Sequence, residues 1–225
     1  DKLIKNADIA MYHVKDQGKN GYQFFSENMN FPYFNNLSLE TGIHKALENN
    51  EFNLLYQPQI DVKSGEIIGV EALLRWQHPE HGNVLPSDFV PFAEETGLIL
   101  EIDNWVLRNA VSQISQWIKA GQTKVRMSVN ISARHLSEDN IVEEITAVLN
   151  EFNVPGRCIE IEITENAIMA DMEGVIKKLN KLSALGISFA IDDFGTGYSS
   201  LTYLHKLPIH TLKIDQTFLQ VDRLA

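Results

Sequence analysis

The sequence predicts an α/β protein with the architecture of a βα-barrel, and three observations predict it. Segments typical of strands alternate with segments typical of helices over most of the chain, as in a parallel sheet built from βα units. The length of 225 residues corresponds to about one large domain. Apolar residues make up 44% of the chain, so a sizeable core can be buried.

Six segments are predicted to be strands because apolar and β-branched residues dominate them. They are 52–60, 67–76, 125–131, 158–164, 187–192 and 211–218. A closed (β/α)8 barrel needs eight strands and typically about 250 residues. Six strands therefore predict a sheet that is open in this chain, with two exposed edges.

Helices are predicted between the strands. The clearest one shows apolar residues at spacings of three and four: Met172, Val175, Ile176, Leu179 and Leu182. Asp171 is its predicted N-cap and Gly186 its predicted end. Similar patterns run over 136–149 and 102–118, and a helix at about 37–48 precedes the first strand. The long segment between the second and third strands has room for two helices.

Residues 1–30 are predicted to be the remnant of a separate upstream domain. Four of them share one helical face: Leu3, Ala7, Met11 and Val14. A turn at 18–21 then leads into a short strand at 22–25. One helix and one strand bury too little surface to be stable alone. Residues 31–36 are the predicted linker, and 37–225 form the main domain.

The charge balance argues against some classes of partner. The chain carries 19 Lys and Arg against 30 Asp and Glu, a net charge of −11. That excess of acid argues against binding to DNA or RNA polymers and against a polybasic membrane-surface module. No apolar run reaches the roughly 20 residues of a spanning helix, and the first residues do not form a signal peptide. The single cysteine, Cys158, fits a reducing compartment, so we predict a cytoplasmic domain and leave open a membrane anchor upstream.

Polar side chains lie near the ends of the predicted strands, on the side where barrel enzymes hold their active sites. Strands covered on both faces should be almost wholly apolar, yet acid or amide groups stand at five such positions: Glu71, Asn130, Glu162, Asp192 and Asp193. Carboxylates gathered at one place repel one another unless some protonate or a cation binds between them. Oxygen ligands without histidine or cysteine favour Mg²⁺ or Mn²⁺, and such a site suits phosphoryl chemistry.

Plainer interpretations of these residues remain open at this point. Glu160 and Glu162 alternate with isoleucines, which is also typical of an antiparallel strand with one wet face. Asp192 and Asp193 could form an ordinary strand-to-helix turn with an Asx cap. Lys213, in the last strand, is either a structural partner for nearby acids or a group that orients water.

Histidine and cysteine give weaker signals. His78 and His81 have the spacing of some metal sites, but the proline and glycine beside them indicate a surface turn instead. Cys158 heads an apolar strand, so we expect a small buried residue with an unreactive thiol.

At the positions of the acidic residues the chain resembles the EAL domain, the cyclic-di-GMP phosphodiesterase family. Glu71-Ala72-Leu73 opens the stretch Glu-Ala-Leu-Leu-Arg-Trp. Further matching stretches follow in family order: Leu55-Tyr56-Gln57-Pro58, Val129-Asn130-Ile131-Ser132, Glu162-Ile163-Thr164-Glu165, residues 192–200 and Leu212-Lys213-Ile214-Asp215. Several separate motifs in register make this resemblance very specific.

Residues 1–30 resemble the end of a GGDEF (diguanylate cyclase) domain. The similarity lies in Ala7-Asp8-Ile9-Ala10-Met11-Tyr12 and Gly18-Lys19-Asn20-Gly21-Tyr22. The Gly-Gly-Asp-Glu-Phe loop itself is absent from the sequence, so we expect no cyclase activity in this chain.

The EAL resemblance implies a particular fold and activity. The fold is a modified TIM-like (β/α)8 barrel with an antiparallel first strand, of which this chain holds about six strands. The activity is metal-dependent hydrolysis of cyclic-di-GMP to linear pGpG in bacterial second-messenger signalling. The resemblance also implies a homodimer through the barrel and an upstream GGDEF domain in the parent protein.

It further implies roles for single residues. One Mg²⁺ or Mn²⁺ would be held by Glu71, Asn130, Glu162 and Asp192, and a second by Asp192 and Asp193. The implied catalytic residues are Glu71, Asp193 and Lys213, the last of which would position the attacking water. Gln57, Leu74 and Arg75 would bind the substrate, with Arg75 on a phosphate. Glu165 would support the loop at 194–200.

The family barrel has two more strands than this chain, and they carry a metal-associated glutamate and a glutamine of the substrate site. We therefore expect either that the 225-residue chain is truncated or that another copy covers the gap, and that the isolated chain hydrolyses cyclic-di-GMP negligibly. One alternative is a catalytically silent EAL domain that acts as a cyclic-di-GMP receptor or interaction module. Another is an unrelated glycosidase with Glu71 and Glu162 as acid and base. That alternative gives Asn130, Asp192, Asp193 and Lys213 no shared role.

Overall fold

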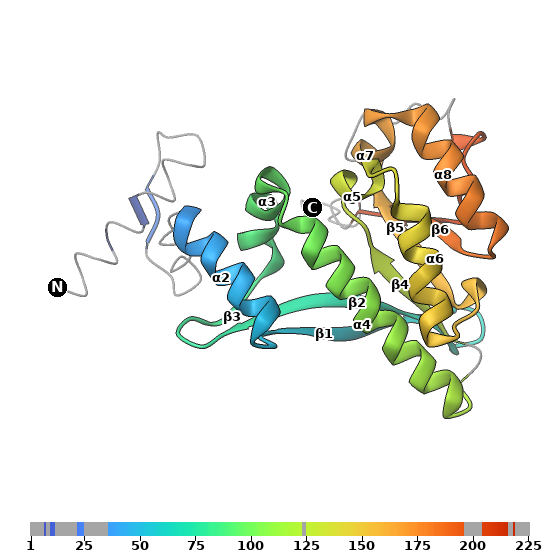
Figure 1. Cartoon of the computed structure of the whole chain (residues 1–225), viewed down its shortest axis with the longest axis horizontal. Helices are drawn as coiled ribbons and strands as arrows, with labels where there is room; N and C mark the ends of the chain where they lie inside the picture. The colour runs from blue at the N-terminus through green and yellow to red at the C-terminus, as the bar shows by residue number, and fades with distance from the viewer. Residues whose placement is uncertain are drawn as a thin grey trace, which may run out of the picture.

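We describe the fold from a computed structural model of the chain (Figure 1). It describes residues 7, 10–11, 22–24, 36–122, 125–195, 204–215 and 218. The helix and strand predicted within residues 1–30, and the linker at 31–36, lie largely outside the described residues.

One mixed sheet organises the described part of the chain. Along its main path the strands are β1 (Phe52–Ile60), β2 (Ile67–His78), β4 (Arg126–Asn130), β5 (Ile159–Thr164), β6 (Ser188–Phe194) and β7 (Thr211–Ile214), in that spatial order. β1 runs antiparallel to β2, and each later strand on this path is parallel to its neighbour. The structure therefore confirms the six predicted strands and the antiparallel first strand.

A tight turn joins β1 to β2, and the long hairpin that they form extends along one side of the fold in Figure 1. The Asp61 carboxylate accepts hydrogen bonds from the backbone N–H groups of Lys63 and Ser64, at 3.0 and 2.7 Å. Gly65 has a φ of 71°, a conformation that favours glycine. The turn sets a register in which Gln57 lies opposite Glu71.

Seven α-helices flank the sheet within residues 36–195 of the described chain. They are α2 (Asn36–Glu48), α3 (Pro86–Thr96), α4 (Ile99–Lys119), α5 (Ala133–Ser137), α6 (Ile141–Phe152), α7 (Glu165–Ala170) and α8 (Met172–Ala184). α3 and α4 are the two helices expected between the second and third predicted strands. The predicted N-cap of α8 is also confirmed, because Asp171 Oδ1 accepts a hydrogen bond from Gly174 N at 3.1 Å.

Besides shifts of one or two residues in strand bounds, with Cys158 in a 3-10 helix, η3 (Gly156–Cys158), the structure differs from the sequence prediction in four larger ways. A short strand, β3 (Gly82–Val84), pairs with β2 after a turn in which His78 Nδ1 accepts from the backbone of Glu80. The helical pattern at 136–149 is split, because α5 ends before Glu138 and α6 begins at Ile141. α7 was not predicted. The last strand ends at Ile214 instead of extending to 218.

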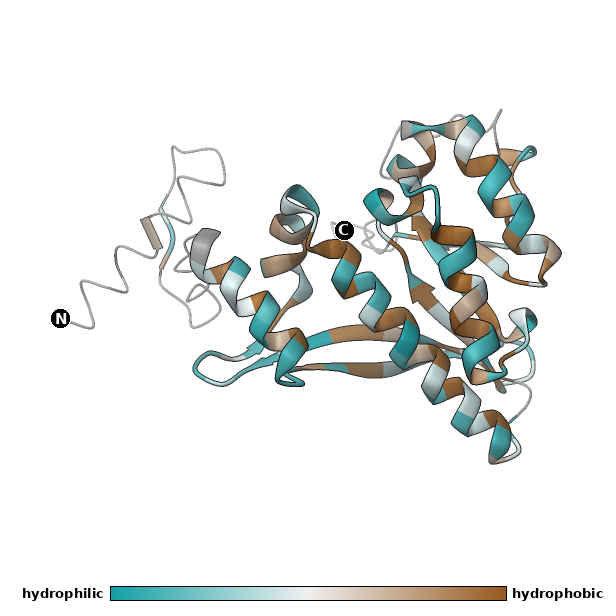
Figure 2. Cartoon of the chain, viewed as in Figure 1, coloured by the Kyte–Doolittle hydropathy of each residue, from teal (hydrophilic) through white to brown (hydrophobic). Residues whose placement is uncertain are grey.

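The core lies between the sheet and the amphipathic helices, along which apolar and polar residues alternate in Figure 2. Phe52, Trp76 and Phe89 form its aromatic centre, with ring centroids 5.3 to 5.7 Å apart. Burial of such a side chain contributes about 1.5–3 kcal/mol. Cys158 is buried as predicted, and its burial raises the pKa of the thiol. Within the part of the chain that the structure describes, none of the helices is long and apolar enough to span a bilayer.

A buried histidine joins three helices behind the sheet. His135 on α5 is 3% exposed; its Nε2 lies 2.9 Å from Glu144 Oε2 on α6, and its Nδ1 lies 3.5 Å from Asp103 Oδ2 on α4. Burial alone would lower the pKa of His135, but the two carboxylates outweigh it, and the pKa lies above its ordinary value.

This raised pKa predicts a stability that depends on pH. The charged form is favoured by folding, so its contribution is complete below the unfolded pKa of about 6.5 and is lost as the pH rises through the folded pKa. We expect the difference in unfolding free energy between the parent chain and His135→Gln to shrink as the pH rises from 6 to 9. Urea unfolding followed by circular dichroism measures it. A difference that stays constant over this range would show that the charge on His135 contributes nothing.

Candidate active site

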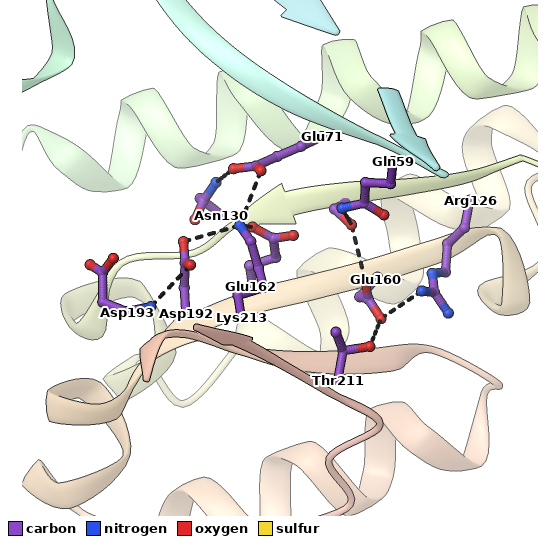
Figure 3. A network of polar contacts seen from close by, with 11 residues as sticks. Gln59, Glu71, Arg126, Asn130, Glu160, Glu162, Asp192, Asp193, Thr211 and Lys213 are labelled. Carbon is purple, nitrogen blue, oxygen red and sulfur yellow. Dashed lines mark hydrogen bonds and ion pairs between the residues drawn. The ribbon is translucent and has the colours of Figure 1, made fainter. Parts of the chain in front are cut away.

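Five polar side chains converge near the carboxyl ends of β4, β5, β6 and β7, and one of them, Glu71, comes from the middle of β2. Glu71 on β2, Asn130 on β4, Glu162 on β5, Asp192 on β6 and Lys213 on β7 lie close together in Figure 3. The strand register brings them together, because Asn130 pairs with Glu162 and Asp192 pairs with Thr164. Parallel strands present their carboxyl ends at one edge, so side chains distant in sequence meet there.

Helix caps directly after the strands hold these ends in place. Ser132, two residues after Asn130, caps α5 and accepts a hydrogen bond from His135 N at 3.1 Å. Thr164, two residues after Glu162, caps α7 by accepting from Ala167 N at 3.4 Å. After β4 and β5, a capping side chain therefore begins the next helix two residues beyond the site residue, which limits the movement of that residue.

Lys213 is the centre of the cluster. Its Nζ donates to Glu71 Oε2 at 3.0 Å, to Asp192 Oδ2 at 3.2 Å and to Glu162 Oε2. Asn130 Nδ2 donates to the other oxygen of Glu71 at 3.0 Å. One ammonium group thus faces three carboxylates. Its single positive charge cannot balance all three when they are ionised, so the cluster would attract a further cation.

The burial of Glu162 shapes the electrostatics of the cluster. This side chain is 1% exposed, and burial raises its pKa to about 7. Lys213 opposes that shift, whereas repulsion from Glu71 and Asp192 adds to it. For Lys213, burial alone would lower the pKa, but its hydrogen bond and attraction to Glu162 and then Glu71 raise it. Lys213 is therefore charged at neutral pH, and Glu162 is the group whose ionisation a further cation would favour.

The donor set fits a hard divalent cation. Glu71, Glu162 and Asp192 each offer a carboxylate oxygen, and these three oxygens lie within 4.8 Å of one another. Glu162 Oε1 is buried and has no hydrogen-bond partner among the described residues. A buried carboxylate oxygen without a partner is costly unless a cation or water satisfies it. Three carboxylates and an amide, without histidine or cysteine, suit Mg²⁺ or Mn²⁺.

A β-bulge in β6 sets the positions of the two adjacent aspartates, Asp192 and Asp193. Ile191 pairs with Leu212 and Phe194 with Ile214, so Asp192 and Asp193 together stand opposite Lys213 alone. Asp193 has a φ of 51°, which aspartate tolerates better than most residues. The extra residue leaves Asp192 in contact with Lys213, and the strand continues after Asp193.

Asp193 lies beside the group of three carboxylates, on the outer side of Asp192 in Figure 3. Its backbone N–H donates to Asp192 Oδ1 at 3.0 Å, and its side chain is exposed. Partial desolvation raises the pKa of Asp193, and the carboxylates of Asp192 and Asp215 raise it further. The bulge thus corrects the interpretation of these two residues as an ordinary strand-to-helix turn.

Of the other predicted site residues, Leu74 and Arg75 lie farther along β2, Gln57 lies on β1 and Glu165 lies on α7. Gln57 stands opposite Glu71 in the β1–β2 register and is exposed. Arg75 Nη1 donates to the carbonyl of Leu74 at 2.7 Å, and the Leu74 side chain packs against the core. Glu165 is the first residue of α7. Residues 196–200 of the loop it was predicted to support lie outside the described residues.

A second polar group lies beneath the cluster, and sequence reasoning missed it. Glu160 is 1% exposed on a strand that is parallel to both neighbours, so the interpretation of β5 as an antiparallel strand with a wet face is wrong. Its partners are Arg126, Ser128 and Thr211. Position in the strand was the available signal: Ser128, Glu160 and Thr211 each stand two residues before a cluster member, on the same face.

Comparison with known families and proteins gives consistent matches. Residues 41–224 match the EAL domain family. The bifunctional diguanylate cyclase/cyclic di-GMP phosphodiesterase MucR of Pseudomonas aeruginosa is 44% identical over 218 residues, which is 97% of this chain and 32% of MucR. The cyclic di-GMP phosphodiesterase PdeR of Escherichia coli is 40% identical over 218 residues, 97% of this chain and 33% of PdeR. The chain thus spans about a third of the length of these curated relatives.

Solved structures show the same fold. The PaMucR phosphodiesterase in complex with c-di-GMP superposes with a TM-score of 0.78 at 41% identity, covering 80% of this chain and 73% of that chain. The FimX EAL domain from Pseudomonas aeruginosa bound to c-di-GMP superposes with a TM-score of 0.73 at 26% identity, covering 81% and 73%.

Proposed function

Because this chain belongs to the EAL domain family, we propose that its site hydrolyses one phosphodiester bond of cyclic-di-GMP to give linear pGpG. The observation that carries the proposal is the group of three carboxylates, Glu71, Glu162 and Asp192, each of which offers an oxygen within 4.8 Å of the others, while the buried Glu162 Oε1 has no hydrogen-bond partner among the described residues. A site that gathers carboxylates around such an oxygen is built to hold a cation. Phosphoryl transfer is the reaction class that uses cations of this kind.

The residues present fit one cation better than two. Glu71, Asn130, Glu162 and Asp192 would hold the first Mg²⁺ or Mn²⁺, and Asp192 with Asp193 would contribute to a second. When bound, the cations would polarise the scissile phosphate and lower the pKa of the attacking water. The family implies a further ligand for the second ion from a strand outside this chain.

The remaining side chains orient the reactants. Lys213 would hold the attacking water by a hydrogen bond from Nζ, because its raised pKa keeps it a donor at neutral pH. Arg75 would contact a substrate phosphate, a pairing that its planar guanidinium favours. Gln57 and Leu74 would line the substrate cleft, and Glu165 would support the loop at 194–200.

The organisation of the parent protein is a further part of the proposal. β1 and β7 stand at the two ends of the strand path in the described residues. We propose that two strands outside this chain close the barrel and that 1–30 is the tail of a GGDEF domain joined by 31–36 to an EAL domain beginning at 37. A homodimer through the barrel and a cytoplasmic location belong to the same proposal.

Turnover of cyclic-di-GMP tests the function. We expect a chain extended through the two closing strands to form pGpG with Mg²⁺ or Mn²⁺ and to stop on addition of chelator, with the product followed by chromatography. The 225-residue chain should be at least about a hundredfold slower, because misplaced ligands and water alone cost that much.

Three other outcomes would change the proposal. Equal turnover by the two chains would show that the closing strands are dispensable or are supplied by a partner subunit. Binding of cyclic-di-GMP by the extended chain without product under any metal would favour the receptor role instead. Hydrolysis that resists chelation would contradict the metal-dependent mechanism.

A further inference from the structure

The carboxylate of Glu160 is buried in the sheet, two residues before Glu162 of the cluster. Glu160 Oε1 accepts a hydrogen bond from Thr211 Oγ1 at 3.0 Å and forms an ion pair with Arg126 Nη2, also at 3.0 Å. Glu160 Oε2 accepts from Ser128 Oγ at 3.1 Å, and Gln59 Nε2 donates to that hydroxyl oxygen at 3.3 Å. Figure 3 shows this group, which we call the Glu160 layer, beside the cluster. Through it one carboxylate connects β1, β4, β5 and β7.

The Glu160 layer is in register with the cluster above it. Ser128 precedes Asn130 by two residues, Glu160 precedes Glu162 and Thr211 precedes Lys213. Residues two apart in a strand point to the same face and lie roughly 6.6 Å apart along it. A shift of one of these three strands within the Glu160 layer therefore moves a cluster residue by a similar amount.

β7 is the strand that most needs this support. In the described residues it pairs with β6 alone, and that pairing is interrupted at the bulge opposite Lys213. The bond from Thr211 to Glu160 passes across β6 and fixes β7 against β5. This hydrogen bond holds β7 at Thr211, two residues before Lys213, whose ammonium group contacts three carboxylates.

We infer that Glu160 is a positioning residue that acts through Thr211 to hold Lys213 among Glu71, Glu162 and Asp192. This inference rests on the proposed function, in which the same carboxylates receive a divalent cation. Lys213 and the cation compete for these oxygens, so the position of Lys213 sets the affinity of the cluster for the ion. Glu160 touches neither substrate nor ion in this role.

The test compares variants of Thr211 in their affinity for Mn²⁺, measured by electron paramagnetic resonance on the 225-residue chain. Thr211→Val keeps the shape of the side chain and removes its bond to Glu160. We expect Mn²⁺ to bind about threefold more tightly, because a looser Lys213 neutralises the carboxylates less well. Thr211→Ser, which keeps the hydroxyl, should restore the parent affinity.

Thr146→Val is the matched control. Thr146 is a partly buried threonine on α6, outside the sheet, whose Oγ1 donates to the carbonyl of Val142 in the same helix. Its replacement removes one hydroxyl hydrogen bond in the same way, and we expect no change in Mn²⁺ affinity. Thermal unfolding of each variant separates a loss of stability from a change in affinity.

A double-mutant cycle with Lys213→Met decides whether Thr211 acts through Lys213. In the Lys213→Met background we expect Thr211→Val to change Mn²⁺ affinity no further. Additive effects, or an unchanged affinity in Thr211→Val alone, would overturn the inference and leave the proposed function standing. If neither the 225-residue chain nor the extended chain binds Mn²⁺, both are overturned. If the effects of Thr211→Val and Lys213→Met on Mn²⁺ affinity are coupled but the extended chain forms no pGpG, the inference on Glu160 stands and the proposed hydrolysis is overturned.

Discussion

Replacement of Glu71 by alanine is expected to abolish cyclic-di-GMP hydrolysis in a chain that carries the closing strands. Glu71 supplies one of three carboxylate oxygens within 4.8 Å of one another and orients Asn130 through a 3.0 Å hydrogen bond. Its loss removes one cation ligand and frees a second. We expect turnover to fall at least about a thousandfold, or about 4 kcal/mol at 1.36 kcal/mol per tenfold. Chromatographic measurement of pGpG at saturating Mn²⁺ checks this value.

The structure also predicts that Glu71→Ala folds normally. Lys213 keeps Glu162 and Asp192 as partners, and one source of repulsion on Glu162 disappears. The control is Glu151→Ala, which breaks an exposed ion pair with Arg108 at a distant surface and should leave turnover unchanged. Retention of even a tenth of the parent turnover in folded Glu71→Ala would remove Glu71 from the set of cation ligands.

Lys213→Met is expected to change turnover and metal affinity in opposite directions. Loss of the ammonium group leaves Glu71, Glu162 and Asp192 without their shared partner, so Mn²⁺ should bind about tenfold more tightly. Turnover should nevertheless fall about a hundredfold, because no group then holds the attacking water. Mn²⁺ titration and pGpG production are measured on the same preparation.

Lys178→Met is the matched control for Lys213. Lys178 Nζ also makes well-formed hydrogen bonds, to the carbonyls of Leu136 and Ser137 at 2.9 and 2.8 Å, but its partners are uncharged. Its replacement should lower stability slightly and leave both metal affinity and turnover unchanged. If Lys213→Met weakened Mn²⁺ binding, Lys213 would have to support the ligands more than it competes with the ion.

The strands were predictable because apolar and β-branched residues recur in each predicted segment. β3 was not, since Gly82–Val84 is too short to show a period and its pairing with β2 depends on a turn held by His78. The break between α5 and α6 was missed for a related reason. The apolar spacing continues from Leu136 to Ile141, and only the local backbone shows that the first helix has ended.

The acidic cluster was predictable from position, because polar residues at the ends of parallel strands meet at one edge. Residue types alone did not show which neighbours share a face across the sheet, so the partners of Glu160 were missed. Nor did the sequence show the bulge that sets Asp192 against Lys213 and leaves Asp193 outside the group of three carboxylates. An extra residue in a strand has no periodic signature when both residues are aspartates.

The antiparallel first strand has a consequence for the order in which the sheet forms during synthesis. Only residues 61–66 separate β1 from β2, so this pair can close at small entropic cost before a crossover helix exists. Each parallel pair on the main path must wait for the crossover between its strands. Along the main path, the spatial order of the strands follows their order in the chain. During synthesis, each later strand can therefore pair with the free edge of the sheet already formed, starting from the β1–β2 hairpin.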